Sequence, residues 1–187
     1  KIFHTVGSLK GNKIAIMGPS GGDMAMLGDI SEGLAINYSP IPKKIIKNLK
    51  QVNHKGVIIS NPFDLQTYNW NDPESLKKTF DLIFKANFNL VGLMLDFPNI
   101  NECDIAEWEA IVDKFLLSAK EKKTFAVIIA SLPETLPKHI RNKCLKSGVA
   151  PLQGLKESLH AVHSSILTGQ AWSKYNKLKV YKSNNKT

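Results

Sequence analysis

Cysteine is scarce in this sequence, and no stretch is long and apolar enough to suggest a membrane span. The two cysteines, Cys103 and Cys144, fall in separate predicted helices without histidines at metal-ligand spacing, which argues against a zinc site or a disulfide framework. No apolar run approaches the roughly 20 residues of a membrane helix, and the start lacks the pattern of a signal peptide. We therefore expect a cytoplasmic protein with no metal site and no membrane contact.

Arginine is also scarce, which bears on the net charge of +9. Five of the lysines lie in the terminal segment, and without them the excess falls to 9 − 5 = +4. Aromatic residues do not alternate with the lysines as they do on a surface that binds nucleic-acid strands. We therefore expect no nucleic-acid partner. The lysines of the terminal segment are Lys174, Lys177, Lys179, Lys182 and Lys186.

Length and composition indicate one globular domain. With 187 residues, of which 43% are apolar and 22% charged, the chain can bury a core and is neither disordered nor fibrous in composition. Polar and glycine residues near the start predict an incoming linker over residues 1–12, and the lysine-rich end predicts a polar basic tail over 171–187. The folded domain is expected at 13–170.

Strand-like and helix-like segments alternate along this domain. Asp72 followed by Pro73 marks one helix start, because aspartate caps free N–H groups and proline loses nothing at the first helical position. The alternation predicts an α/β fold, namely a flavodoxin-like, doubly wound parallel sheet of about five strands with helices on both faces. Ligands of such sheets bind at the carboxyl ends of the strands. Strands are expected at 13–17, 36–38, 89–95, 124–130 and 149–152.

The first strand runs into a glycine-rich turn, Gly18-Pro19-Ser20-Gly21-Gly22, which leads to a helix. Unpaired N–H groups and the helix dipole at such a start favour an anion, so Ser20, Gly21 and Gly22 are candidate phosphate contacts. The turn is neither a dinucleotide fingerprint nor a P-loop. A tight turn that needs glycine only for its backbone angles remains the alternative.

The same turn also satisfies the G-x-S-x-G pattern of a serine hydrolase, with Ser20 as the nucleophile. Its position argues against this rival, because a nucleophile elbow normally follows several strands. His139, His160 and His163 are predicted within helices, where a general base is not expected. No other group of residues completes a reaction, so we assign no catalytic residue in this chain.

Two further loops are candidates for the site. In Asn61-Pro62-Phe63-Asp64 the proline sets the turn, and Asn61 and Asp64 either pin neighbouring backbone or shape a site. In the loop from Asp96 to Asn101, Asn101 is a good helix cap whose free N–H groups face the same sheet edge as Ser20. Two helix starts converging on one edge predict a phosphate or carboxylate site.

These loops carry a resemblance to a known family. The stretches that match are Lys13-Ile-Ala-Ile-Met-Gly-Pro-Ser-Gly-Gly, Asn61-Pro-Phe-Asp, Leu93-Met-Leu-Asp-Phe-Pro, Ala130-Ser-Leu-Pro-Glu and Gly148-Val-Ala-Pro-Leu-Gln-Gly-Leu. In order and spacing they resemble the succinyl-CoA-ligase-like flavodoxin domain of NDP-forming acyl-CoA synthetases, including feruloyl-CoA synthetase-like members. The resemblance covers roughly residues 5–170.

The resemblance implies a function shared with other domains. The family converts a small carboxylic acid, CoA and ATP or GTP, used with Mg²⁺, into acyl-CoA, NDP and phosphate through a phosphorylated histidine. This chain resembles the domain that lends a helix N-terminus to that phosphohistidine, so its expected partners are the CoA-binding, phosphohistidine and nucleotide-grasp domains. The domain itself is expected to hold no cofactor and to be inactive alone. His4-Thr5-Val6-Gly7 departs from the family's phosphohistidine motif, so His4 receives no role.

The same resemblance implies roles for particular residues. Asn99, Ile100 and Asn101 would contact an anion or acyl phosphate, while Ser20, Gly21 and Gly22 would line the neighbouring wall. Asn61, Asp64 and Asp96 would shape the site. The family's loop is glycine-rich where this one reads Phe97-Pro98-Asn99, and proline supplies no N–H donor. A free-standing small-ligand binding module is the other alternative, since it needs only the same sheet edge.

Overall fold

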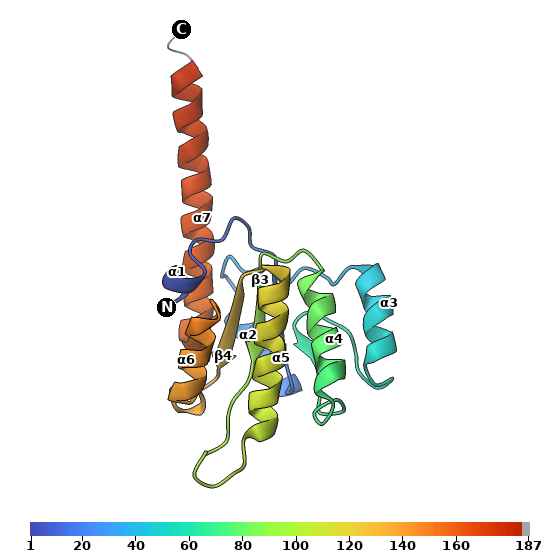
Figure 1. The fold of residues 1–187 in the computed structure, drawn as a ribbon. Helices are drawn as coiled ribbons and strands as arrows, with labels where there is room; N and C mark the ends of the chain where they lie inside the picture. The colour runs from blue at the N-terminus through green and yellow to red at the C-terminus, as the bar shows by residue number, and fades with distance from the viewer. Residues whose placement is uncertain (185–187) are drawn as a thin grey trace.

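The chain folds around a five-stranded parallel sheet, seen in a computed structural model that describes residues 1–184, with side chains to Tyr175 (Figure 1). The strand order is β2-β1-β3-β4-β5, which confirms the predicted flavodoxin-like α/β fold. The strands are β1 (Ile14–Gly18), β2 (Phe63–Asp64), β3 (Leu90–Met94), β4 (Ala126–Ala130) and β5 (Ala150–Gln153). The α-helices are α1 (Ile2–Thr5), α2 (Gly21–Ile30), α3 (Lys43–Val52), α4 (Pro73–Phe84), α5 (Ala106–Lys122), α6 (Lys138–Lys146) and α7 (Leu155–Asn184), and the 3-10 helix η1 spans Pro133–Thr135.

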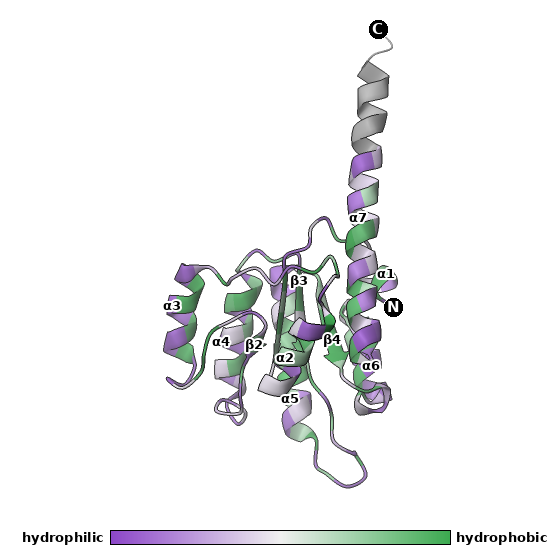
Figure 2. Cartoon of the chain, turned by 180° about the vertical axis from the view of Figure 1, so that it is seen from behind, coloured by the Kyte–Doolittle hydropathy of each residue, from purple (hydrophilic) through white to green (hydrophobic). Residues whose placement is uncertain are grey.

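Helices cover both faces of the sheet. The helices α3, α4, α5 and α6 pack their apolar residues into the larger of two cores, and α1, α2 and α7 form the smaller core on the opposite face. Figures 1 and 2 show these two layers from opposite sides. Every residue of β1, β3 and β4 is buried, as expected for strands covered on both faces.

The strand order reverses between β1 and β3. The chain leaves β1 for the edge strand β2 and then returns to pair β3 with the other side of β1, where Ile14 lies opposite Leu90. The helices that follow β1 and β3 therefore lie on opposite faces of the sheet and diverge at this point. Such a switch point is where open α/β sheets bind their ligands.

Along the described chain, no continuous strand runs along the outer side of β1. Two short segments pair with it instead, and the side chain of Asn61 lies between them. The strand predicted at 36–38 is a single bridge between Lys13 and Asn37, and β2 pairs only with the end of β1. Between them, the Asn61 amide accepts from Ile16 N (3.3 Å) and donates to Ile14 O (2.8 Å) and to Ser39 O (2.9 Å). The side chain thus replaces backbone hydrogen bonds that a continuous strand would supply.

The helix starts agree with the sequence in part. Asp72 caps α4 as predicted, because its carboxylate accepts from Ser75 N at 3.0 Å. Helix α3 begins at Lys43 after Pro42, and no side chain caps it. Cys103 lies exposed in a loop rather than in a helix, whereas Cys144 is buried in α6. Burial raises the pKa of the Cys144 thiol to about 12, so this thiol is inert at neutral pH.

Both ends of the chain depart from the expected linker and tail. Within residues 1–12, Ile2, Val6 and Leu9 are buried against α7, and Leu9 N donates to Ser165 O at 3.1 Å. A Cβ on Gly169 would lie 1.9 Å from Leu9 O, so the segment crosses the helix at a position that only glycine allows. The sequence did not indicate this packing, because these three apolar residues are separated mainly by polar residues and glycine.

Helix α7 continues through most of the predicted tail, to Asn184. Figure 1 shows it projecting beyond the sheet at the end opposite the long loop that precedes α5. The side chains of Lys177, Lys179, Lys182 and Lys186 lie outside the described residues. No helix in the described part of the chain combines the length and the apolar character that crossing a membrane requires.

Candidate functional site

The carboxyl ends of β1 and β3 border a cavity of about 580 Å³, which we call the switch-point pocket. Pro19 and Asp23 contribute the wall from the β1–α2 junction, and Trp70 comes from the segment after β2. Asp96 follows β3, and Glu107 and Trp108 belong to the first turn of α5. The two helices that diverge from the switch point therefore both begin at this cavity.

At the start of α2, Ser20, a predicted phosphate contact, is the N-cap. Its Oγ accepts from Asp23 N at 3.3 Å, while Gly21 and Gly22 are exposed. The first N–H groups of a helix have no partner within the helix, so the Gly21 and Gly22 amides, between the lining residues Pro19 and Asp23, have no acceptor within α2. A Cβ on Gly21 would lie 2.9 Å from Asp64 Oδ2, whereas one on Gly22 would meet nothing closer than 3.8 Å.

The start of α5 differs from the prediction that placed it near Asn101. The helix begins at Ala106, whose N–H donates to Asp104 Oδ1 at 2.9 Å. Asn101 instead lies in a turn in which its own N–H donates to Asn99 Oδ1 at 3.1 Å. The amides of Glu102 and Cys103 both donate to Asn99 O at 3.0 Å. The turn satisfies its own donors, and the assignment of Asn101 as a helix cap is wrong.

Asn99 and Ile100 border a different cavity, of about 450 Å³, opposite Glu134 and Thr135. The structure thus brings the start of α2 together with the true start of α5, but places Asn99 and Ile100 at a neighbouring cavity. A signal for the true start was present in the sequence. Asp104 followed three residues later by Glu107 matches the sequence signature of a helix N-terminus, although in the structure Ile105 is the N-cap and its side chain does not cap the helix.

Asp96 holds the loops around the pocket together. Its Oδ1 accepts from Ser131 N at 2.8 Å and from the Thr135 hydroxyl, and its backbone oxygen accepts from Trp108 Nε1 at 3.0 Å. It therefore ties the end of β3 to the loop after β4 and orients one aromatic wall. Asp64 accepts from Gln66 N at 2.8 Å, so it closes the turn after β2 beside Gly21.

The pocket has acidic and aromatic walls. Asp23, Asp96 and Glu107 are its ionisable lining residues. Burial raises the pKa of the Asp23 carboxyl; the hydrogen bond with Ser20 opposes this rise, and the charge of Asp96 adds to it. The Trp70 and Trp108 rings meet edge to face, with centroids 5.2 Å apart. Sequence reasoning named neither tryptophan as a site residue and missed Asp23 and Glu107.

The structure also bears on two other kinds of site, a metal site and the active site of a serine hydrolase. Within the described part of the chain, no three histidine, cysteine or acidic side chains converge well enough to hold a metal ion. The Ser20 oxygen serves as a helix cap, His139 Nε2 pairs with Glu109 at 2.8 Å, and His163 Nδ1 accepts from Ala35 N at 2.9 Å. These partners leave the serine hydrolase reading without a serine–histidine pair among the described residues.

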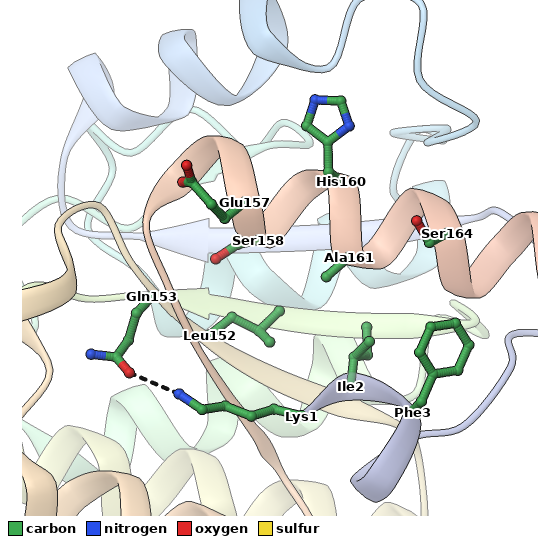
Figure 3. Close-up of a pocket in the computed structure, with 10 residues that line it drawn as sticks. All are labelled: Lys1, Ile2, Phe3, Leu152, Gln153, Glu157, Ser158, His160, Ala161 and Ser164. Carbon is green, nitrogen blue, oxygen red and sulfur yellow. Dashed lines mark hydrogen bonds between the residues drawn. The ribbon is translucent and has the colours of Figure 1, made fainter.

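A second cavity, of about 680 Å³, lies between α1 and α7 at the end of β5 (Figure 3). Lys1 Nζ donates to Gln153 Oε1 at 2.7 Å across it, and Glu157 and His160 lie on its α7 wall. The pKa of the Lys1 side-chain amine is lowered by burial and by the nearby charge of Arg141. This cavity adjoins an edge strand rather than the point where the strand order reverses, so the switch-point pocket is the better candidate site.

No family model and no curated protein matches the chain. Among solved structures, PH0766 from Pyrococcus horikoshii OT3 is similar, with a TM-score of 0.70, 16% identity and 85% of this chain covered. A dinucleotide-forming acetyl-coenzyme A synthetase 1 from Candidatus Korarchaeum cryptofilum is similar in two states, apo and with phosphate and ADP. Both give a TM-score of 0.67 and 14% identity and cover 92% of this chain. At these identities the likeness shows a shared fold, and the chain spans 36% of the length of each of these structures.

Proposed function

We propose that this chain is one domain of an NDP-forming acyl-CoA synthetase, which joins a small carboxylic acid to CoA with ATP or GTP. The observation that carries the proposal is the shared fold, which covers 92% of this chain and only 36% of a larger acetyl-coenzyme A synthetase. The loop motifs that first suggested the family support it independently. The feruloyl-CoA synthetase-like branch stays a prediction, as does a cytoplasmic location.

The switch-point pocket is the proposed meeting place with the phosphohistidine-bearing domain. The exposed amides of Gly21 and Gly22, at the positive end of α2, would stabilise a phosphoryl group brought to this edge. Asp64 and Asp96 would keep the surrounding loops in place through their backbone hydrogen bonds. Asn99 and Asn101 would act mainly by shaping their own loop, because the Asn101 amide is already bonded to Asn99.

The acidic residues that line the switch-point pocket disfavour the binding of a free anion. Asp23, Asp96 and Glu107 would repel a free phosphate, so a phosphoryl group at α2 would need accompanying positive charge. A partner domain or Mg²⁺ carried with the nucleotide would supply it. We therefore propose that CoA, nucleotide and Mg²⁺ are held by other domains, and that this domain is inactive alone.

The experiment uses the whole protein that carries this chain, incubated with γ-labelled ATP or GTP, CoA and a panel of small carboxylic acids. We expect a labelled, acid-labile phosphohistidine and an acyl-CoA thioester, detected by mass spectrometry. The variant Gly22→Asp adds a negative charge where a Cβ has open space, and we expect it to slow ligation at least about tenfold.

The matched control is Gly22→Ala, which adds only the Cβ at the same exposed position and should ligate at the normal rate. Equal rates for the Asp and Ala variants would remove α2 from the mechanism while leaving the family assignment intact. Absence of both phosphohistidine and thioester with every nucleotide and acid tested would overturn the assignment itself.

A further inference from the structure

The three carboxylates of the switch-point pocket differ from the acidic residues on the outer helices. Apart from Glu107, the acids of α4 and α5 are matched with bases, for example Asp81 with Lys77 at 2.8 Å, Glu109 with His139 at 2.8 Å, and Asp113 with Lys143. None of Asp23, Asp96 and Glu107 forms an ion pair with any residue in the described part of the chain.

This gathering of negative charge stands against the overall charge of the protein. The chain carries 25 lysine and arginine residues against 16 acidic ones, yet none of the described bases lines this cavity. Three like charges around one cavity repel one another and are stabilised by a positive guest. The cavity, at about 580 Å³, is large enough for a small organic molecule or a long side chain.

The aromatic wall narrows the kind of guest. Trp70 and Trp108 lie with their rings at 77° to each other, so the face of one ring and the edge of the other meet in a corner. Hydrogen bonding of Trp108 Nε1 to Asp96 O fixes one of these rings. Indole faces attract ammonium and guanidinium groups through their quadrupole, whereas a small hydrated metal ion requires oxygen ligands that the described residues do not bring together.

We propose that the switch-point pocket binds an organic cation, an ammonium or guanidinium group, held between the Trp70 and Trp108 indoles and the carboxylates of Asp23, Asp96 and Glu107. The Oδ1 atom of Asp96 accepts from Ser131 and Thr135, which leaves Oδ2 as the oxygen available to the guest. The group belongs either to a free small amine or to a lysine or arginine side chain. The inference rests on the cavity itself and does not require the proposed ligase function.

The test measures tryptophan fluorescence of the full chain in a Trp172→Phe background, because Trp172 lies on α7 away from the pocket. The probes are choline and its uncharged carbon isostere, 3,3-dimethyl-1-butanol, which has the same shape. We expect saturable quenching by choline and binding of the isostere at least about tenfold weaker. Methylguanidinium and a short peptide with one central arginine then separate a free amine from a side chain as the source.

Charge-removing variants locate the binding. Asp23→Asn and Glu107→Gln should each weaken choline binding by about three- to tenfold, since each removes one of three charges around the guest. The matched control Glu109→Gln removes a charge from the same helix outside the pocket and should leave the affinity unchanged.

Circular dichroism confirms that each variant is folded, and the Trp108 indole N–H signal in NMR gives a second readout. Equal affinity for choline and its isostere, no saturable binding of any cation, or equal loss in Glu109→Gln would each overturn the proposal. A failed phosphohistidine assay would leave it untouched, because no step of this test uses nucleotide or CoA.

Discussion

The two helices that begin at the switch-point pocket reach it in different ways. Helix α2 starts directly after β1, with Ser20 as its cap and two exposed glycines in its first turn. Helix α5 starts only after a long loop, in which Asn99 binds the amides that the sequence had suggested as anion donors. A short strand–helix junction leaves its N–H groups facing the ligand edge, whereas a long one has room to satisfy them internally.

The β1–α2 side also depends on the sheet edge beside it, where the largest effect is expected. Asn61→Ala removes three hydrogen bonds, to Ile14, Ile16 and Ser39, and leaves two strand groups of β1 without that partner. We expect a loss of about 3 kcal/mol in the free energy of unfolding, measured by urea denaturation. Asn101→Ala, in the exposed loop before α5, is the control and should change stability by less than about 0.5 kcal/mol.

The next largest effect is a difference in stability between alanine variants of two glycines in the same turn. A Cβ on Gly18 would lie 2.7 Å from Met94 O and 2.9 Å from the Met24 side chain, so Gly18→Ala should cost about 2 kcal/mol by overpacking. Gly22→Ala, whose nearest neighbour would be 3.8 Å away, should be neutral or stabilise the helix by about 0.5 kcal/mol. Similar unfolding midpoints for the two variants would contradict the close junction of β1 with α2.

Capping comes third and compares the two helix starts directly. Ser20→Ala and Asp104→Ala should each cost about 1 kcal/mol, because each oxygen accepts from an amide at its helix start. Thermal or chemical unfolding measures both. If Asn101→Ala were as costly as Asp104→Ala, α5 would begin where the sequence suggested and the structural description of this loop would fail.

The smallest effect is a pH dependence at Asp23. Its pKa is raised in the folded state, mainly by burial, so the folded form holds its proton more tightly than the unfolded form. Stability from this group is therefore lost as the pH rises from the ordinary aspartate pKa of 3.8 through the higher folded value. Asp23→Asn should remove this loss. Denaturation curves at several pH values would show the two proteins converging in acid, and parallel pH profiles would argue against the raised pKa.

Much of the fold was predictable because its signals are local. The apolar runs of β3 and β4, the Asp72-Pro73 helix start and the Ser20 turn each act within a few residues. The start of α5 was not, because Asn101 and Asp104 are both residue types that favour a helix start, and the local sequence does not show which of them the helix follows. Ile2, Val6 and Leu9 were hidden in a polar segment whose packing partner, α7, lies at the other end of the chain.

The position of the switch point was predictable, but the residues that line the cavity beside it were not. The switch point follows from strand order, and Ser20, Gly21 and Asp96 do lie at or beside it. The acidic and aromatic character was missed because Trp70 and Glu107 belong to segments distant from the glycine turn in sequence. Only the folded sheet brings them to one cavity.

The most direct test of the switch-point pocket as the ligand site is an NMR titration of the 187-residue chain with choline. We expect saturable shifts of the Trp70 and Trp108 indole signals and of the Asp23 and Glu107 amides, with the Trp172 signal unchanged. Shifts confined to Glu157 and His160, in the cavity between α1 and α7, or no shifts at all, would contradict it.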